Sequence, residues 1–576
     1  MGEKKVDVMI TAFRDGLQSV HGARVLSTDI MPAVAAAAAA GFDHFEAGGG
    51  ARFQSLCFYL RENPFDMKDA FRLETGPAAK LQTLARGINV VGLESQPRDV
   101  IQLHAELFAK HGISAVRNFD ALNDVDNLVY SGQAIADAGL EHEIAVTMME
   151  LPPDCQGAHT PEFYMQVVRR ILDSGVPFEA ICFKDASGTS VPGKVHETLR
   201  QARQLLPDGT RMVFHTHDTA GLGIACYLAA IEAGVDQIDL SLAPVSHGTA
   251  QPDVLTMWHA LRGSEYSLDI DYRRVLEAEQ VLKDALADYF VPPEATAVEP
   301  QIPLSPMPGG ALTANTQMMR DADILDKYPA VIAAMGEVVR RGGYGTSVTP
   351  VSQFYFQQAF NNVMLGPWER IVEGYGKMVL GYFGKTPVEP DAEVVRIAAE
   401  QLGLEPTRES PLDHNDADPN KGLAMARRRL DAAGVLKTEE NLFIAATCGD
   451  KGIAFLKGEG QLALRKKQKE APAAGAGDAQ SAPERPVVVR MPAADCLPCI
   501  DPAAVDGEPV HAEMPGRVVR IPVKVGQTVT AGELLMVQEH LLTRFETRAP
   551  RAGTVAAILV QVGEHVDFEQ ELAKIA

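Results

Sequence analysis

The chain has 576 residues, of which 46% are hydrophobic and 22% are charged, and this composition indicates a globular protein with about two to four domains. Its net charge of -23 and isoelectric point near 5.1 argue against nucleic acid as a partner, because nucleic-acid binding needs clustered lysine and arginine. No stretch reaches the roughly 18 apolar residues of a membrane span, and residues 1–10 lack the apolar core of a signal peptide, so we expect a cytoplasmic protein. The seven cysteines indicate no disulfide framework, and Cys496 and Cys499 have zinc-like spacing without a second pair nearby.

The first half of the chain alternates short β-rich runs with helical runs. One helical run, 27–41, offers Ser27 or Thr28 as an N-cap and ends at Gly41. Eight such strand and helix units within about 260 residues predict an α/β fold, a (β/α)8 TIM barrel over residues 1–265. A doubly wound open sheet is the alternative, but it gives less reason for polar residues to gather at so many strand ends. The predicted strands are 6–13, 44–48, 81–86, 115–120, 143–149, 180–186, 212–218 and 237–242.

The second half predicts three further segments. Residues 266–464 are mainly helical in pattern and form either a separate lobe or an extension packed on the barrel. Residues 465–508 are charged and rich in Ala, Pro and Gly, which predicts a flexible linker. Residues 509–576 contain two matching halves, 514–537 and 551–575, each with a β-branched strand, a "VG" turn and a second short strand. This repeat predicts a small β sandwich on a mobile tether.

Three side chains at the predicted mouth of the barrel are of types that bind a divalent metal. His215 and His217 are two residues apart on a strand and therefore point to the same face. Asp15 ends the first strand, which in a closed barrel is two strands away from the strand with the histidines. A pair of histidines on a strand is more often structural. Two imidazoles and one carboxylate that converge, however, form a metal site with open positions, suited to activating a carbonyl or enolate oxygen.

Lys184 ends the sixth predicted strand, next to the strand with the histidines. An ammonium group cannot bind a metal, and the simplest interpretation is a salt bridge with Asp185 or Asp218. A buried lysine with a lowered pKa can instead act as a base, form a Schiff base, or take up CO2 to become a carbamate, which is an oxygen ligand. The residues alone leave these alternatives open.

Arg14 and Gln18 flank Asp15, and Arg86 ends the third predicted strand. The guanidinium fork of arginine matches a planar carboxylate, so these side chains are suited to hold the acid group of a substrate beside the metal. Each residue taken singly fits a surface or helix-capping role equally well. The cluster, more than its members, indicates an acid-binding site.

Several motifs together resemble a known family. "FRDGLQS", "ARGINVVG", "VRNFDALND", "CFKDASG", "HTHDTAG" and "PGGALTANTQ" are similar to the carboxyltransferase domain of pyruvate carboxylase, the oxaloacetate decarboxylase alpha subunit and the small-acid subunit of transcarboxylase. "SVTPVSQ" and "GYFGKTP" resemble that family's helical extension, the conserved carboxylase domain, and the tail resembles a biotinyl (lipoyl-like) domain. The aspartate and two histidines are shared with metal-dependent lyases such as hydroxymethylglutaryl-CoA lyase, and "RDGLQ" is closer to that lyase. Lys184 favours the carboxyltransferases, which have a carbamylated lysine at this point.

The resemblance implies metal-dependent carboxyl transfer or decarboxylation of a 2-oxo acid. Oxaloacetate and biotin would give pyruvate and carboxybiotin, or the reverse. Arg14, Gln18 and Arg86 would hold the substrate carboxylate, Arg14 would also stabilise the enolate oxygen, and Thr313 would carry a proton between the pyruvate methyl group and biotin. The implied ligands of a zinc, manganese or cobalt ion are Asp15, Lys184, His215 and His217.

Three positions depart from the family pattern, and all three concern biotin. Gln54 replaces an aspartate and Leu93 replaces a tyrosine that line the biotin pocket in the relatives. Leu542 stands where the tail would carry its biotin lysine, and no lysine occurs between Lys524 and Lys574. We therefore expect biotin to be carried by a separate protein, either a biotin carrier or a biotin carboxylase subunit. The alternatives are a biotin-independent lyase or decarboxylase and a non-catalytic assembly subunit; by resemblance we expect a homodimer or a larger complex.

Overall fold

The computed structural model forms two units, which are described separately: residues 1–317 and 327–490, which hold the barrel, and residues 318–326 and 491–576, which hold the C-terminal β domain. In the part of the chain that the structure describes, no helix is both long and apolar enough to cross a membrane. The expected biotin position, Leu542, and the pair Cys496 and Cys499 lie outside the described residues. The described residues are 4–467, 487–488, 507–512, 516–540, 543–567 and 569–576.

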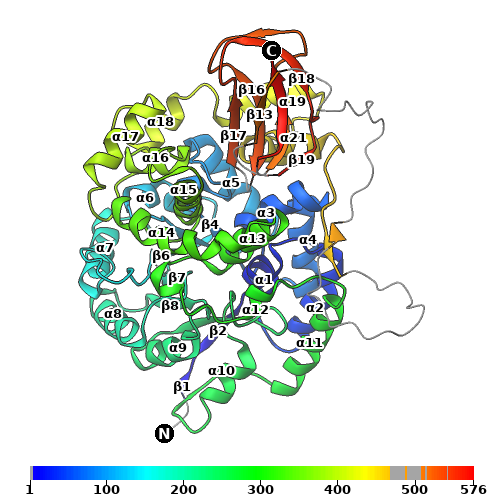
Figure 1. The fold of residues 1–576 in the computed structure, drawn as a ribbon. Helices are drawn as coiled ribbons and strands as arrows, with labels where there is room; N and C mark the ends of the chain where they lie inside the picture. The colour runs from blue at the N-terminus through cyan, green and yellow to red at the C-terminus, as the bar shows by residue number, and fades with distance from the viewer. Residues whose placement is uncertain (1–3, 468–486, 489–506, 513–515, 541–542, 568) are drawn as a thin grey trace, which may run out of the picture. The chain divides into compact units, whose positions relative to one another are not determined.

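Eight parallel strands close into a barrel, so the predicted TIM barrel is confirmed (Figure 1). Each predicted strand is found, with ends shifted by a few residues. The first strand, β2, pairs with the last, β9, and β9 pairs with β8, which closes the sheet. The strands are β2 Asp7–Ile10, β3 His44–Glu46, β4 Lys80–Ala85, β5 Ala115–Phe119, β6 Glu141–Thr147, β7 Ala180–Asp185, β8 Arg211–Thr216 and β9 Gln237–Leu240.

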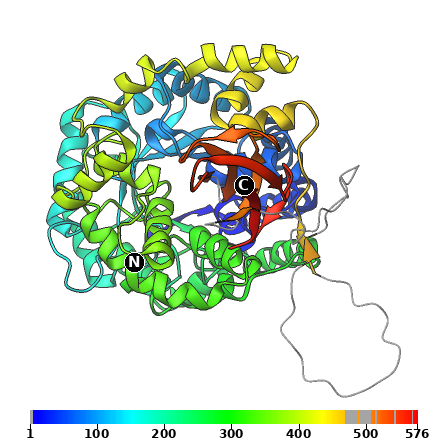
Figure 2. The same ribbon diagram turned by 45° about the horizontal axis from the view of Figure 1, so that its top comes forward.

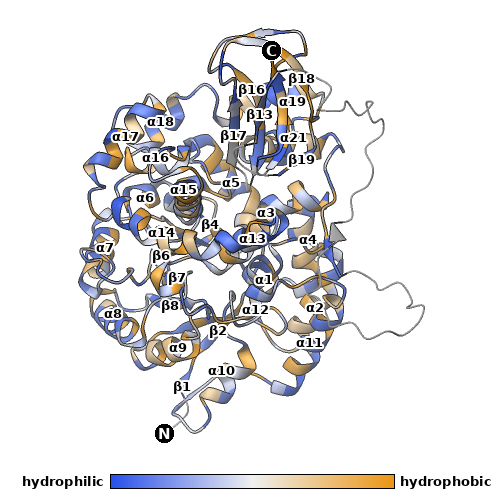
Figure 3. Ribbon diagram, in the orientation of Figure 1, coloured by the Kyte–Doolittle hydropathy of each residue, from blue (hydrophilic) through white to orange (hydrophobic). Residues whose placement is uncertain are grey.

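Helices follow the strands and form the outer layer of the barrel, coloured from blue through cyan to blue-green in Figure 2. Helix α7 shows why these segments are helical: the Thr160 side chain accepts a hydrogen bond from Phe163 N, and proline and left-handed Gly175 flank the two ends. The outer helices carry both polar and apolar residues (Figure 3), as expected for one buried face. They are α1 Leu17–His21, α2 Ser27–Ala39, α3 Gly50–Ser55, α4 Pro64–Thr75, α5 Arg98–Lys110, α6 Asp126–Asp137, α7 Pro161–Ser174, α8 Pro192–Leu205, α9 Gly223–Glu232 and α10 Val254–Ala260, with the short turns η1 Ala12–Gly16, η2 Leu56–Leu60 and η3 Gly87–Asn89.

The predicted N-cap of α2 is wrong by one residue. The cap position is Leu26, which makes no side-chain cap, and Ser27 is already helical. The reason is a tertiary contact, because the Ser27 N–H and hydroxyl both bind the carboxylate of Glu62 at 2.9–3.0 Å. A distant carboxylate therefore binds the first N–H group of this helix and also holds the Ser27 hydroxyl that was expected to act as a local cap.

Residues 272–456 form a helical extension packed on the barrel, which settles the open alternative of a separate lobe. Phe443 of α20 packs edge-on against Phe53, with ring centroids 5.5 Å apart, and Asn127 of α6 donates to Phe383 O at 2.8 Å. A short strand β1, Lys4–Lys5, also pairs with β10, Tyr266–Ser267. The extension comprises α11 Tyr272–Ala285, α12 Pro293–Thr296, η4 Ile302–Leu304, α13 Gly309–Asp321, η5 Leu325–Lys327, α14 Tyr328–Arg341, α15 Val351–Leu365, α16 Glu373–Val379, α17 Ala392–Leu402, α18 Pro411–Ala417, α19 Gly422–Ala433, α20 Glu439–Thr447 and α21 Gly449–Leu456.

The C-terminal domain is a sandwich of two four-stranded antiparallel sheets, ordered β13-β20-β18-β15 and β17-β16-β14-β19. Each half of the sequence repeat sends its short middle strand, β15 or β19, into the sheet of the other half, which ties the two halves together. Its interior is a single apolar cluster that includes Val518, Leu535, Val555 and Leu572. The strands are β13 Glu508–His511, β14 Gly516–Arg520, β15 Thr528–Val529, β16 Leu534–His540, β17 Thr543–Arg548, β18 Gly553–Ile558, β19 His565–Val566 and β20 Glu571–Ile575.

The predicted linker is not wholly without regular structure at its ends. Strand β11, Arg465–Lys466, pairs antiparallel with β12, Val487–Val488. Residues 468–486 and 489–506 lie outside the described residues, so flexibility of the linker stays a prediction.

Candidate active site

Asp15, His215 and His217 converge at the mouth of the barrel. Asp15 lies in the turn η1 directly after β2, His215 is in β8, and His217 follows the end of β8. The Asp15 Oδ2 atom is 3.5 Å from His215 Nε2 and 3.4 Å from His217 Nε2, and one ligand atom of each residue lies within 4.8 Å of the others. All three residues are buried. The three candidate metal ligands are therefore brought together as the sequence predicts.

Both histidines are held with Nε2 facing the cluster. His215 Nδ1 lies 2.8 Å from Asp239 Oδ2, and His217 Nδ1 lies 2.6 Å from Thr249 O. Because each partner is an acceptor, each Nδ1 carries the proton and each Nε2 offers a lone pair. Burial, aided by Lys184, lowers the pKa of His215 well below its usual value. Burial opposes ionisation of Asp15, but Arg14 and His217 outweigh it and keep the Asp15 pKa well below its usual value. Asp15 and His215 are thus held in the deprotonated forms that a divalent metal requires.

Lys184 lies beside this cluster. Strand register places it opposite His215, and its Nζ atom is 2.8 Å from His215 Nε2. Burial, reinforced by Arg117 and Arg14, lowers the Lys184 pKa. The expected alternative of a salt bridge is not seen, because Asp185 accepts hydrogen bonds from Ser187, Gly188 and Ser190, and Asp218 pairs with His247. Lys184 therefore faces His215 and the candidate metal ligands instead of pairing with Asp185 or Asp218.

Buried charges beneath the cluster were not predicted from the sequence. Arg117 of β5 forms ion pairs with Glu143 of β6 and Asp239 of β9, and the same Asp239 holds His215. Side-chain exposure of these residues is 1% or less. The sequence does contain one sign of these ion pairs: Arg117 and Asp239 are charged residues inside the β-rich runs "VRNFD" and "QIDLSL". A charged side chain inside a barrel needs a partner of opposite charge.

Arg14 is held by carboxylates. Its Nη2 atom binds Glu46 and lies 3.3 Å from Asp15 Oδ2, and its Nη1 atom lies 3.4 Å from Gln18 Oε1. Burial opposes its charge, but Asp15 and Glu46 outweigh burial and raise the Arg14 pKa. Glu46, like Asp239, is a partner that the sequence did not reveal.

Arg86 has no carboxylate within ion-pair distance among the described residues. Its Nη1 atom donates to the carbonyl oxygens of Val91 and Gly92 at 2.8 and 2.9 Å. Burial, with a further contribution from Arg14, lowers its pKa to about 9, which still leaves a full positive charge at neutral pH. A buried cation without an acidic partner is a strong candidate for binding an anionic ligand.

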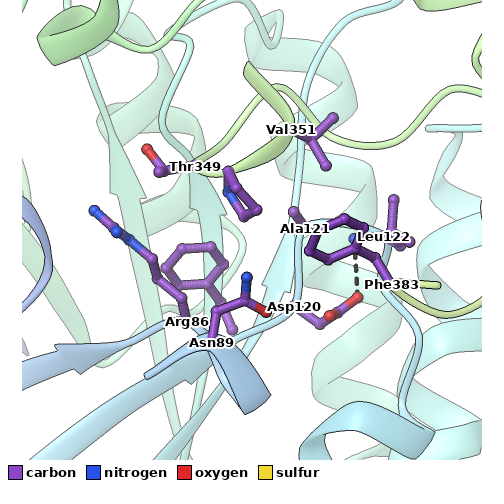
Figure 4. A pocket seen from close by; sticks show the side chains of 10 residues that line it. Arg86, Asn89, Asp120, Ala121, Leu122, Thr349, Val351 and Phe383 are labelled. Atoms are coloured by element: carbon purple, nitrogen blue, oxygen red, sulfur yellow. Dashed lines mark hydrogen bonds between the residues drawn. The ribbon is translucent and has the colours of Figure 1, made fainter. Parts of the chain in front are cut away.

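Gly50 lies beside the side chains of both Arg86 and Gln18. A Cβ atom at Gly50 would lie 3.4 Å from Arg86 Nη2 and 3.8 Å from Gln18 Oε1. A small pocket also adjoins Arg86. The Arg86 side chain lies on one side of this pocket, near Thr349, and Leu122 and Phe383 lie on the opposite side (Figure 4). Two of the predicted acid-binding residues, Arg86 and Gln18, therefore lie on either side of Gly50, and Arg86 also lines a small pocket. The pocket is lined by Arg86, Asn89, Phe119, Asp120, Ala121, Leu122, Thr349, Pro350, Val351 and Phe383.

Thr313 reaches the same mouth from helix α13. Its hydroxyl donates to Ser19 O at 2.6 Å and lies 3.4 Å from the hydroxyl of Thr249, whose carbonyl binds His217. The helix approaches closely because it begins with glycine: a Cβ atom at Gly309 would lie 1.7 Å from Thr249 O. Thr313 is thus two contacts away from a candidate metal ligand.

The two described departures from the family pattern lie apart from the metal cluster. Gln54 is buried and its Nε2 atom is 3.4 Å from Thr447 O at the end of α20. The carbonyl of Leu93 accepts a hydrogen bond from Asn89 Nδ2 at 2.8 Å. Gln54 thereby joins the barrel to the helical extension.

Comparison with known proteins identifies three family models. Residues 302–491 match the conserved carboxylase domain, residues 109–282 match the HMGL-like model, and residues 508–575 match the model described as biotin-requiring enzyme. These matches fall on the helical extension, the barrel and the β domain in turn.

Relatives and solved structures agree with the models. The methylmalonyl-CoA carboxyltransferase 5S subunit of Propionibacterium freudenreichii is 30% identical over 71% of this chain and 80% of its own length. A pyruvate carboxylase subunit of Methanothermobacter thermautotrophicus is 29% identical over 93% of this chain and 94% of its own. The carboxyl transferase domain of Rhizobium etli pyruvate carboxylase, solved with pyruvate, superposes with a TM-score of 0.68 at 25% identity, over 81% of this chain and 82% of that one. The chain therefore belongs to the carboxyltransferase family that includes the transcarboxylase 5S subunit and the corresponding part of pyruvate carboxylase.

Proposed function

We propose that this chain transfers a carboxyl group between oxaloacetate and biotin, with a divalent metal at Asp15, His215 and His217 and with biotin carried by a separate protein. The observation that carries the proposal is the position of these three donors, Lys184 and Arg86 at one mouth of the barrel, where Arg86 has no carboxylate partner among the described residues. Membership of the family indicates the reaction class, carboxyl transfer. The site contains residues suited to bind the metal, hold the acid and move the proton.

The donor set fits a zinc, manganese or cobalt ion. One carboxylate and two imidazoles whose Nε2 atoms face one cluster are a common set for such ions, which also take further ligands. Lys184 would complete the set as a carbamate: its neutral amine adds CO2 and releases a proton. Deprotonation of the ammonium group followed by this addition changes Lys184 from a cation to an anion. The anion offsets the charge of a divalent ion in a buried site. The lowered Lys184 pKa supports it, because only the neutral amine reacts. When bound, the metal supplies a Lewis acid for an enolate oxygen.

The chain's own side chains would bind and orient the acid. The Arg86 guanidinium and the Gln18 amide, which both lie beside Gly50, would hold the substrate carboxylate. Arg14, fixed by Glu46 and Asp15, turns a positive charge toward the enolate oxygen without needing to move. When the carboxyl group leaves oxaloacetate, the electrons left behind form an enolate with a negatively charged oxygen. The positive charge of Arg14 would stabilise that oxygen and so favour the step.

Thr313 would move the proton that balances the transfer. The C4 carboxyl group of oxaloacetate leaves C3 for a biotin ring nitrogen, and the proton of that nitrogen passes through the Thr313 hydroxyl to C3 of the enolate, which gives pyruvate. A hydroxyl can give one proton while it accepts another, so it needs no net charge. The hydroxyl of Thr249 lies 3.4 Å away and is a second candidate for the relay.

Biotin would come from another protein, because the C-terminal domain has no lysine from residue 525 to residue 573. A biotin carrier or a biotin carboxylase subunit is the corresponding partner. A second candidate function is a biotin-independent lyase or decarboxylase. It is favoured by Gln54 and Leu93, which replace biotin-pocket residues, and by the match of the barrel to the HMGL-like model.

Three measurements on the purified full chain test these proposals: avidin blotting, metal content, and oxaloacetate turnover with and without a biotinylated carrier protein. We expect no covalent biotin, about one metal per chain by the donor set, and turnover that depends on the carrier. Equal turnover without carrier would favour the biotin-independent decarboxylase. A chain that binds no metal would contradict both functions.

A further inference from the structure

The side-chain amide of Gln251 lies among the three candidate ligand atoms, although no sequence motif singled it out. Its Nε2 atom is 3.2 Å from Asp15 Oδ2, 3.0 Å from His217 Nε2 and 3.5 Å from His215 Nε2. An amide nitrogen has two hydrogens, so it cannot bind three acceptors well. Gln251 is completely buried. The Gln251 Nε2 atom is therefore surrounded by three acceptor atoms but has only two hydrogens to offer them.

The backbone around Gln251 holds the side chain in this direction. The Gln251 carbonyl accepts from His247 N at 2.8 Å, and the preceding carbonyl, of Ala250, accepts from Asp218 N at 2.9 Å. The loop is thereby tied to the segment that follows His217. A side chain aimed at the site by two backbone hydrogen bonds is preorganised, and preorganised donors bind with little entropic cost.

The Gln251 amide oxygen is bound by the hydroxyl of Thr11, which can bind either the oxygen or the nitrogen of an amide. Gln251 Oε1 is 2.7 Å from Thr11 Oγ1, which also lies 3.1 Å from Leu240 O. A hydroxyl donates one hydrogen bond and accepts two. If Thr11 donates to Leu240, its oxygen can accept from an amide N–H. A half-turn of the amide about its last torsion would then exchange its oxygen and nitrogen without loss of the hydrogen bond to Thr11.

We propose that Gln251 is a further ligand donor of the metal centre, with Oε1 directed toward Asp15, His215 and His217, and with Nε2 bound by Thr11. An N–H group directed at a cation is repelled, whereas an amide oxygen is a neutral donor that hard divalent ions accept. Gln251 adds a donor without adding charge. This inference rests on the proposed metal function but concerns a separate residue.

Metal affinity of the full chain tests the proposal, measured by competition with a chromophoric chelator for Zn²⁺ and Co²⁺. Gln251→Leu keeps the volume and removes the donor, and we expect it to weaken binding about tenfold or more. Gln251→Glu restores an oxygen donor and is expected to bind at least as tightly as the original chain. The visible absorption of bound Co²⁺ should change in Gln251→Leu, because these bands report the ligand set.

Gln358→Leu is the matched control. Gln358 is also a completely buried glutamine, but its partners are Asn362, Arg370 O and Val372 N, far along the chain in the helical extension. Circular dichroism checks that each variant is folded. Unchanged affinity in Gln251→Leu would overturn the proposal, as would equal losses in Gln251→Leu and Gln251→Glu, which indicate packing alone. If the original chain binds neither metal, the proposed function fails as well, so the two failures are distinguishable.

Discussion

Asp239→Asn tests whether the buried charges beneath the barrel mouth tune the metal site. Asp239 and His215 are both fully buried and share a hydrogen bond of 2.8 Å. Burial alone would raise the Asp239 pKa, but Arg117 and His215 keep it below its usual value, so the carboxylate is charged. A hydrogen bond to a charged group is worth about 1.5–3 kcal/mol. We therefore expect metal affinity to fall about tenfold to hundredfold, as for other partners of ligand histidines.

Glu143→Gln provides the comparison, measured by chelator competition under the same conditions. It removes a carboxylate from the same Arg117 but leaves the contact of Asp239 with His215 in place. Both variants should lose similar stability, yet only Asp239→Asn should lose most of its metal affinity. Equal affinities in the two variants would refute the view that Asp239 acts through His215.

Further predictions concern four other parts of the chain. His215→Ala should remove bound metal and turnover together, measured by metal analysis and oxaloacetate assay; turnover without metal would contradict the site. Thr313→Ala should keep metal but stop carboxyl transfer to a carrier, and loss of metal would refute its role as a proton carrier. Lys68 is completely buried over three phenylalanine rings, and burial lowers its pKa from 10.5 to about 7. The folded chain therefore binds the Lys68 proton less tightly than the unfolded chain does, so the free energy of unfolding rises with pH between about 7 and 10.5. In urea unfolding, Lys68→Met should lose about 1–3 kcal/mol of this rise between pH 7.5 and 9.5. An unchanged pH profile in the variant would contradict this role of Lys68. Removal of residues 509–576 should weaken assembly with partners in size-exclusion chromatography but preserve metal binding, because the β domain has its own apolar core; loss of metal would contradict this separation.

The barrel could be predicted because each strand is a short β-rich run bounded by helical pattern. Polar residues at strand ends then meet at one mouth, which is why Asp15, Lys184 and His215 were correctly brought together. The convergence of Asp15, His215 and His217 follows from the closed order of strands alone, because β2, β9 and β8 are neighbours.

The partners of these residues could not be predicted, because no local pattern marks them. Asp239 contacts Arg117 across 122 residues of sequence, and Gln251 contacts Asp15 across 236. Gln251 lies in an irregular loop, where side-chain direction depends on the backbone path and not on a period. The α2 cap failed for the same reason, since Glu62 lies 35 residues from Ser27. Contacts over such separations appear only in the folded chain.

Transfer of a labelled carboxyl group to biotin tests the central claim most directly. Oxaloacetate labelled with ¹⁴C at C4 is incubated with the full chain, the metal and a biotinylated carrier protein, and the carrier is then isolated and counted. The proposed carboxyltransferase predicts label on the carrier, and none when the carrier lacks biotin or the chain carries His215→Ala. Release of labelled CO2 at the same rate without carrier, with no label on biotin, would contradict it.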